Sequence, residues 1–174
     1  ACDDVKSFCK TPYPPTDDFM KERGIPSAEE YVQNTVYTKA KKLYGDLLPG
    51  PVLDRIKGEL DAITKNKFST IYLISQQLVY KSRSDGYVVG SRGSVGSSFV
   101  AYLMDITEVN SLPPHYRCPK CYYSSFKLNP EEKIKYGIRK DETEYQKLLE
   151  NVTSGYDLPD RNCPVCGTVF ERDG

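Results

Sequence analysis

The chain has 174 residues, of which 39% are hydrophobic and 28% charged, and its formal net charge at pH 7 is zero. This composition fits a globular protein with one core and a small appendage. Its longest apolar stretch, residues 99–104, is far shorter than the roughly 20 residues of a membrane-spanning helix. The first residues do not resemble a secretory signal, so we expect a cytoplasmic protein without a membrane span. The zero net charge does not indicate autonomous nucleic-acid binding.

Residues 1–26 are rich in proline and aspartate, and prolines occupy three of the five positions 11–15. Proline fixes its own backbone torsion and biases the preceding residue toward extended structure. We therefore interpret residues 1–26 as a linker or the tail of a preceding domain. Because the chain begins with Ala1 rather than Met, we expect it to be an excised fragment of a longer protein.

Three helices are predicted before any strand. The first begins after Ser27, which forms a capping-box pattern with Glu30, and it ends at Gly45. The second begins at the prolines of segment 49–51, and the third covers residues 68 to about 85. The apolar positions expected on the core-facing sides are Val32, Val36, Ala40 and Leu43, then Val52, Ile56, Leu60 and Ile63, then Ile71, Ile74 or Ser75, Leu78 and Val79.

A short strand over residues 87–89, a glycine-serine loop over residues 90–98 and a buried helix over residues 99–104 are predicted next. Loop amides and hydroxyls at the start of a helix favour an anion such as phosphate, and Arg92 adds a charged donor. The spacing matches neither the P-loop nor the dinucleotide-binding fingerprint. A tight strand-to-helix crossover explains the small residues equally well. The candidate phosphate-binding residues are Gly90, Ser91, Arg92, Gly93, Ser94, Gly96 and Ser97.

Two C-x-x-C turns predict a metal site. Their thiols, from Cys118, Cys121, Cys163 and Cys166, can complete a tetrahedral zinc shell, and such a closed set is structural rather than catalytic. The 41 residues between the turns exceed what a compact zinc ribbon needs. Iron bound to the same thiolates and a pair of disulfides are the competing interpretations.

The other residues near these turns are interpreted as structural. Cys2 and Cys9 are too peripheral to join the metal site, so we expect ordinary thiols. His115, the only histidine, is expected to be a turn residue or a hydrogen-bond donor near the site, and not a metal ligand. Residues 129–151 are highly charged with a weak helical pattern, and they are predicted to form an insertion with short helices of its own.

Two long segments closely resemble the PolC-type alpha subunit of bacterial DNA polymerase III. They run from Ser84-Asp85-Gly86-Tyr87-Val88-Val89 through the glycine-serine loop to Ala101, and from Ile106 to Tyr116 with the sequence ITEVNSLPPHY. The similarity continues through the first cysteine turn, and it resumes at SGYDLPD, residues 154–160, before the second. It covers about residues 27–174, and only the insertion departs from the pattern.

This resemblance implies an α+β fold in which N-terminal helices lead into the palm of a polymerase-beta-like nucleotidyltransferase. Residues 27–117 would begin the palm, and residues 118–174 would form the zinc-knuckle subdomain. The loop would contact the triphosphate of the incoming nucleotide. The whole enzyme would extend a primer on DNA with Mg²⁺, in contact with a sliding clamp and other replisome subunits.

The magnesium-binding aspartates of this family follow the second cysteine turn in a D-x-D motif, and the chain contains no D-x-D. Two-metal phosphoryl transfer requires such carboxylates. We therefore expect the 174-residue chain alone to be inactive and to have no catalytic residues of its own. The alternative is a stand-alone zinc-binding or iron-thiolate module that binds proteins or nucleotides without catalysis.

Overall fold

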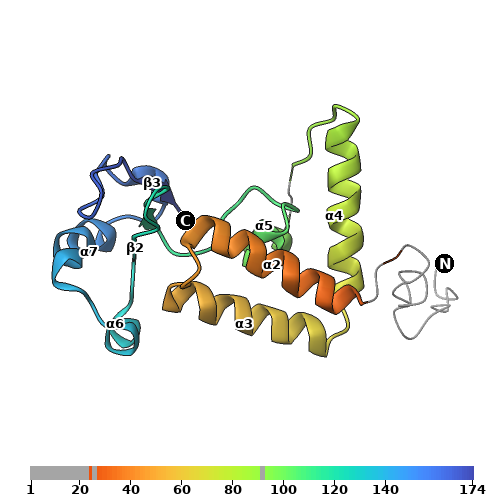
Figure 1. Cartoon of the computed structure of the whole chain (residues 1–174), viewed down its shortest axis with the longest axis horizontal. Coiled ribbons are helices and arrows are strands. Elements are labelled where there is room, and N and C mark those ends of the chain that lie inside the picture. Colours follow the sequence, from red (N-terminus) through yellow and green to blue (C-terminus); the bar gives the residue numbers. More distant parts are fainter. Residues whose placement is uncertain (1–23, 25–26, 91–92) are drawn as a thin grey trace, which may run out of the picture.

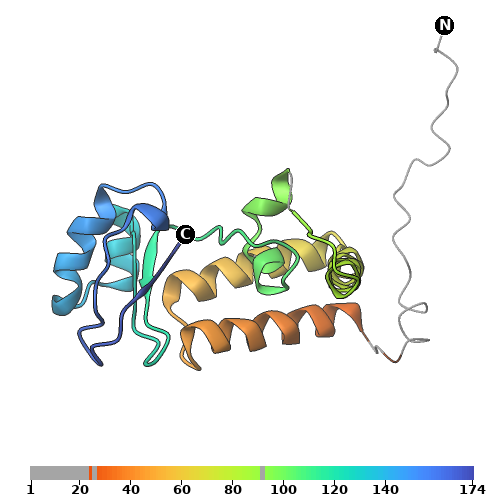
Figure 2. The ribbon, with the colours of Figure 1, turned by 90° about the horizontal axis from the view of Figure 1, so that it is seen from above.

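Four helices form the larger of two lobes in the described part of the chain, which we call the helical lobe (residues 28–104). The computed structural model describes residues 24, 27–90 and 93–174, so the expected linker lies almost wholly outside the described residues. The helices of this lobe are α2 (Ala28–Tyr44), α3 (Gly50–Lys65), α4 (Ser69–Ser84) and α5 (Phe99–Leu103). Helix α2 packs against the other three. Figures 1 and 2 show α2 and α3 side by side, with α4 across their ends.

The first two helices lie where the sequence predicts them. The Ser27 side chain accepts a hydrogen bond from the Glu30 amide at 3.3 Å. Helix α2 ends at Gly45, whose φ of 86° suits glycine, and a Cβ there would lie 3.0 Å from the Cβ of Tyr122. The buried positions confirm most of the predicted faces of both helices; they are Val32, Val36 and Ala40 on α2, and Val52, Ile56, Leu60 and Ile63 on α3. Leu43, also predicted on the α2 face, is only partly buried and packs against the same core.

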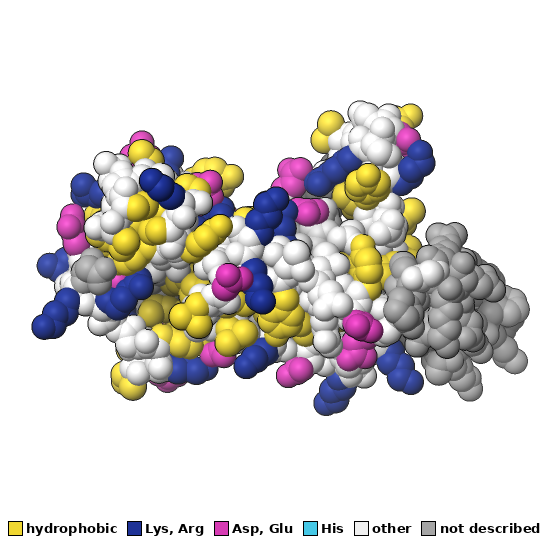
Figure 3. Space-filling view, in the orientation of Figure 1, with side chains coloured by type: hydrophobic (Ala, Val, Ile, Leu, Met, Phe, Trp, Pro, Cys, Tyr) yellow, Lys and Arg dark blue, Asp and Glu magenta, His cyan; other side chains and the backbone are white. Residues whose placement is uncertain are grey.

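The predicted apolar face of α4 is wrong at Ile71 and Leu78, while Ile74, Ser75 and Val79 are half-buried. Ile71 and Leu78 are 43% and 66% exposed, whereas Leu73, Thr70 and Ser69 are buried. The helix stands across the ends of α2 and α3, and its far half extends beyond them (Figure 1). Among the described residues, no element covers the far half closely enough to bury Leu78 and Tyr80, and hydrophobic side chains show along the helix in Figure 3. Periodicity alone does not reveal how much of a helix its neighbours cover.

The predicted strand at residues 87–89 is absent, because this segment has no regular secondary structure and Val88 is 99% exposed. A strand needs a neighbour for its backbone hydrogen bonds. The described strands pair only with one another, in an antiparallel sheet of order β2-β1-β3. These strands are β1 (His115–Arg117), β2 (Ser124–Phe126) and β3 (Glu171–Asp173). In the central strand, His115 is opposite Phe126 on one side and Asp173 on the other.

The sheet and the segments that connect its strands form the small lobe (residues 115–174). The insertion over residues 129–151 has the short helices expected of it, with a described 3₁₀ turn, η2 (Lys140–Glu142), between them. The helices are α6 (Pro130–Tyr136) and α7 (Thr143–Glu150). Helix α7 packs against β2. The η3 turn (Gly155–Asp157) contacts β3, and a Cβ at Gly155 would lie 2.3 Å from the Asp173 carbonyl oxygen.

The chain is therefore an α+β protein, as the sequence predicts, with a helical lobe and a small antiparallel sheet. The expected buried helix after the glycine-serine loop is present as α5, in which Phe99, Val100, Ala101 and Leu103 are buried. The division into domains at residue 118 stays a prediction.

Candidate functional site: metal centre and glycine-serine loop

The two cysteine turns meet at one point in the small lobe. The four sulfur atoms of Cys118, Cys121, Cys163 and Cys166 all lie within 4.8 Å of one another. The distances are 3.4 Å from Cys118 to Cys166 and 3.4 Å from Cys121 to Cys163. Four thiolates around zinc, each with a bond of about 2.3 Å, would place the sulfurs about 3.8 Å apart. No disulfide joins any two of the four cysteines, and their mutual spacing fits one shared metal ion.

The first turn is held by two backbone hydrogen bonds. The Cys118 amide donates to the Tyr123 carbonyl at 2.8 Å, and the Tyr122 amide donates to the Cys118 carbonyl at 3.1 Å. Tyr122 has a φ of 61°, which is uncommon for a residue with a side chain. This backbone turn brings two thiols to the same side of the loop.

The second turn repeats this pattern. The Cys163 amide donates to the Thr168 carbonyl at 2.8 Å, and the Gly167 amide donates to the Cys163 carbonyl at 2.9 Å. Gly167, with a φ of 73°, takes the place that Tyr122 has in the first turn. The local sequence thus builds the same two-thiol turn twice, and the fold brings the two copies together.

The thiols do not share one electrostatic environment. Burial raises the pKa of the Cys121 thiol to about 12. Hydrogen bonds from Thr168 lower the pKa of the Cys166 thiol to about 6. Ionising all four would gather negative charge in one small volume, so a bound divalent cation is the natural way to stabilise the thiolates.

His115 is not a turn residue, so that interpretation is wrong; it is a fully buried residue of β1. Its Nδ1 donates to the Pro113 carbonyl at 2.8 Å, which leaves Nε2 to accept from the Tyr44 hydroxyl at 3.0 Å. Burial lowers the pKa of the imidazole to about 4. Among the described residues, the group that could hold a metal ion consists of the four cysteines. That His115 binds no metal stays a prediction.

A buried polar junction surrounds His115 and joins the two lobes. The Asn110 amide group donates to the Asp173 carboxylate at 2.8 Å and to the Tyr44 hydroxyl at 3.3 Å. The Tyr102 hydroxyl of α5 also donates to Asp173, at 3.3 Å. Sequence reasoning missed this junction, because its members are far apart in the chain and each has an ordinary local context.

The glycine-serine loop ends in a short 3₁₀ helix, η1 (Ser94–Ser97), which follows Gly93 with its φ of 82°. Ser91 and Arg92 lie outside the described residues. A Cβ added at Gly90, Gly93 or Gly96 would meet no atom within 4 Å. Among the described residues, the glycines of this loop therefore face open space and not a packed neighbour.

The first amides of α5 are not free, in contrast to the expectation for the helix that follows the loop. The Phe99 and Val100 amides each donate to the Glu59 carboxylate at 3.0 Å. The Ala101 amide donates to the Ser98 hydroxyl at 3.1 Å. Any anion would therefore have to bind to the loop itself, and not to the start of α5.

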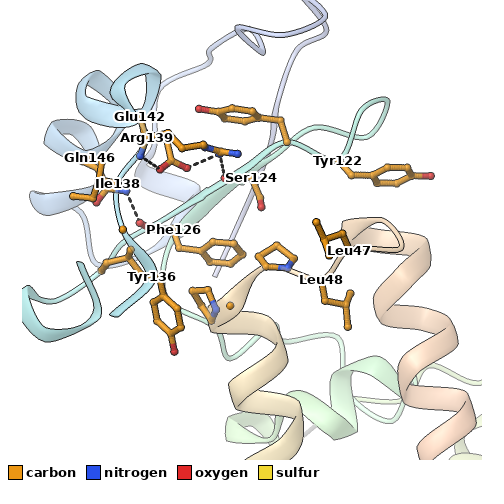
Figure 4. Close-up of a pocket in the computed structure, with 16 residues that line it drawn as sticks. Leu47, Leu48, Tyr122, Ser124, Phe126, Tyr136, Ile138, Arg139, Glu142 and Gln146 are labelled. Carbon is orange, nitrogen blue, oxygen red and sulfur yellow. Dashed lines mark hydrogen bonds and ion pairs between the residues drawn. The ribbon is translucent and has the colours of Figure 1, made fainter. Parts of the chain in front are cut away.

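A separate surface pocket of about 430 Å³ lies where the small lobe meets the connection between α2 and α3 (Figure 4). Leu47, Leu48 and Phe126 line it, with Gln146 on the opposite wall. The Gln146 side chain donates to the Phe126 carbonyl at 2.8 Å. None of the predicted site residues lines this pocket.

The comparisons with known proteins identify the class first. The family model for the bacterial DNA polymerase III alpha NTPase domain matches residues 30–164, which include the glycine-serine loop and the first three metal-site cysteines. The chain therefore belongs to the bacterial DNA polymerase III alpha family.

Within that family, the similar relatives are of the PolC type, which confirms the resemblance. The chain is 49% identical to the DNA polymerase III PolC-type of Pediococcus pentosaceus over 160 residues, 92% of this chain and 10% of the relative. It is 49% identical to that of Thermotoga petrophila over 150 residues, 86% of this chain and 10% of the relative. It is 48% identical to that of Halalkalibacterium halodurans over 160 residues, 92% of this chain and 10% of the relative. The chain thus spans about a tenth of the length of these relatives.

None of the helices in the described part of the chain has the length and apolar character needed to cross a membrane.

Proposed function

We propose that this chain is the opening part of the palm of a replicative DNA polymerase, which adds deoxynucleotides to the 3′ end of a primer on a DNA template. The observation that carries the proposal is the open glycine-serine loop before α5, in a chain whose relatives are named DNA polymerase III PolC-type. Its whole-protein partners would be primer-template DNA, deoxynucleoside triphosphates, a sliding clamp and other replisome subunits. Its place of action would be the cytoplasm.

In this proposal the loop binds the triphosphate of the incoming nucleotide. Glycines without neighbours let phosphate oxygens approach the backbone amides closely. The side chains of Ser91 and Ser94 would add hydroxyl donors, and Arg92 would add a bidentate charged donor. The Ser97 hydroxyl donates to the Ser94 carbonyl at 2.6 Å, so it would reach phosphate only by rotating away from that carbonyl. Gly90 and Gly93 would contribute their backbone amides. Gly96 would contribute open space for the ligand, because its own amide donates to the Gly93 carbonyl at 3.3 Å. Because Glu59 holds the first amides of α5, the loop amides before it are the donors assigned to phosphate.

The magnesium ions of the reaction would be bound by carboxylates outside this chain. The sequence contains no D-x-D, and among the described residues the only group of three or more potential ligands is the cysteine set. Because phosphoryl transfer needs the metals to stabilise the developing charge, the chain by itself should not extend primers. Primer extension well above a buffer blank by the purified 174-residue chain would contradict this.

The four cysteines would hold one structural Zn²⁺ ion. Its role would be to cross-link the two turns and fix the small lobe, since a closed four-sulfur set leaves no position for a substrate. The complete cysteine set also favours a second candidate function, a stand-alone zinc-binding or iron-thiolate interaction module. In that case, changes to the glycine-serine loop of the full-length relative would leave nucleotide use unaffected.

The proposed phosphate role is tested with two variants of the full-length polymerase. Arg92→Ala removes a charged donor, which should cost about 1.5 to 3 kcal/mol and raise the KM for nucleotide about ten- to a hundredfold. Gly93→Val should have a similar effect, because a β-branched residue resists the positive φ and blocks approach to the backbone. Arg161→Ala, on the small lobe, is the matched control. Unchanged nucleotide dependence in both loop variants, with normal folding and zinc content, would show that the loop is only a crossover.

A further inference from the structure

The end of the glycine-serine loop is tied to α3 by one carboxylate. Glu59 accepts the Phe99 amide on one oxygen at 3.0 Å, and the Val100 amide on the other at 3.0 Å. The Ser98 hydroxyl also donates to it, at 2.8 Å. Helices α3 and α5 are in direct contact. The side chain of Glu59 is only 19% exposed, so these bonds are partly shielded from water.

Arg55, one turn earlier on α3, makes the attachment two-sided. Its Nε donates to Glu59 at 2.6 Å, and its second guanidinium nitrogen donates to the Ser97 carbonyl at 2.7 Å. From the other side, the Tyr72 hydroxyl of α4 lies 3.2 Å from the Ser98 hydroxyl. Four consecutive positions, residues 97–100, are thus held by two helices of the core.

This arrangement has a chemical consequence for the loop. The guanidinium of Arg55 balances the charge of Glu59, so the carboxylate is less repulsive to an anion bound nearby. A loop whose end is already fixed loses less conformational freedom when a ligand binds to it. These contacts begin at Ser97, and the open glycines of the loop precede it in the chain.

We propose that Glu59 is a positioning residue which, together with Arg55, holds the glycine-serine loop in the shape that receives the nucleotide triphosphate. This inference rests on the proposed function of the loop. It assigns to α3 a part in nucleotide binding that neither the loop sequence nor the helical pattern of α3 indicates. Glu59 does not touch the nucleotide in this proposal; it acts through the backbone of residues 97–100.

The first measurement tests the attachment itself and does not depend on the loop's ligand. In the full-length polymerase, Glu59→Gln should accelerate hydrogen exchange at the Phe99 and Val100 amides at least about tenfold, because an amide side chain offers one neutral acceptor instead of two charged ones. Asp61→Asn, an exposed carboxylate on the same helix, is the matched control and should leave these amides unchanged. Equal protection in the Glu59 variant and the control would overturn the proposal.

The second measurement tests the positioning role. Glu59→Gln and Arg55→Ala should each raise the KM for nucleotide about tenfold, while kcat and the KM for primer-template change less than about twofold. Arg55→Lys, which keeps the charge and one donor, should recover part of the loss. A general loss of structure would instead lower kcat and both affinities together.

Gly93→Val separates failure of this proposal from failure of the proposed function. If Gly93→Val raises the nucleotide KM but Glu59→Gln and Arg55→Ala do not, the loop binds phosphate without the help of α3 and the positioning role is wrong. If none of the three variants changes the nucleotide KM, the phosphate function of the loop fails, and the positioning role fails with it. A lower nucleotide KM in Glu59→Gln would also overturn the proposal, because it would mean that the carboxylate opposes the triphosphate.

Discussion

The two lobes of the chain are stabilised by different kinds of core. The buried cluster of the helical lobe is mainly aliphatic, and residues such as Val36, Ile56 and Leu103 are fully buried in it. The cluster of the small lobe contains three tyrosines, one phenylalanine, two leucines and two metal-site cysteines. Its described strands have only three residues each. A lobe of this size rarely holds together by burial alone, so we expect the small lobe to depend on a metal bound by the four cysteines, and the helical lobe to fold without one.

The largest expected effect is therefore that of metal removal. Elemental analysis should find close to one zinc per chain, since structural zinc contributes on the order of 10 kcal/mol or more to folding. Chelation, or Cys163→Ser, should abolish the near-ultraviolet circular dichroism of the tyrosine-rich core and leave most of the helical far-ultraviolet signal. Substantial iron, an absence of metal with no free thiols, or unfolding of both lobes together would contradict the expectation that zinc stabilises the small lobe alone.

The next effect concerns the aliphatic core. Ile56→Ala should lower the free energy of unfolding of the helical lobe by about 2 to 5 kcal/mol, because Ile56 is fully buried and its removal leaves a cavity. Leu47→Ala is the control, since Leu47 is 93% exposed and should change little. Denaturant unfolding followed by far-ultraviolet circular dichroism measures both. Zinc content should be the same in both variants, and a loss of zinc from Ile56→Ala would mean that the lobes are not separable.

A smaller effect is expected from the junction between the lobes as the pH falls. The pKa of His115 is lowered to about 4 in the folded protein, from an ordinary value of 6.5. Between these two values the unfolded state binds the proton more readily, so stability falls as the pH drops from 6.5 to 4. The loss should reach about 3 kcal/mol below pH 4. Tyr44, Arg117 and Asp173 are the titratable or charged groups nearest to the imidazole.

The pH dependence is isolated by comparison with His115→Gln, which keeps a polar side chain and does not titrate. Between pH 7 and pH 4.5, the denaturation midpoint of the unaltered protein should fall further than the midpoint of the variant. Since both proteins keep the four cysteines, acid release of the metal affects them alike. Parallel changes in the two midpoints would show that burial of His115 makes no contribution.

The smallest effect is expected at the first helix cap. Ser27→Ala removes the acceptor of the Glu30 amide and should lower the stability of the helical lobe by about 1 kcal/mol. Ser27→Asp, which also accepts hydrogen bonds at a helix start, should retain most of the stability. Thermal unfolding of the three proteins distinguishes them, and equal melting temperatures would contradict the role of the cap.

The sequence predicts local features well because their causes are local. The ends of α2 follow from Ser27 and Gly45, and the buried face of α3 follows from a regular apolar repeat. The two C-x-x-C turns contain enough information to predict the cysteine cluster, because each turn directs its own two thiols.

The errors arise where distant segments decide the structure. The exposed half of α4 extends past the first turns of α2, which contact α4 through Tyr31 and Gln76. The segment 87–89 has the composition of a strand but no described partner. Glu59 was missed for the same reason, because its partners lie about 40 residues further along the chain and a glutamate on a helix is usually a solvated side chain. The only local signal was an arginine four positions earlier, which is a common pairing on helix surfaces.

Asp173 determines how much of this chain could be moved as a unit into another protein. Its carboxylate accepts from Asn110 and from Tyr102, and Tyr102 belongs to the same five-residue helix whose first amides bind Glu59. If the small lobe were transplanted from the first cysteine onward, it would contain Asp173 but neither of these donors. The Asp173 carboxylate would then have to be hydrated at the new boundary. Keeping both donors of Asp173 requires a unit that begins at α5 and includes residues 99–174, and even this unit would lose Glu59 of α3 and Tyr44 of α2 as hydrogen-bond partners.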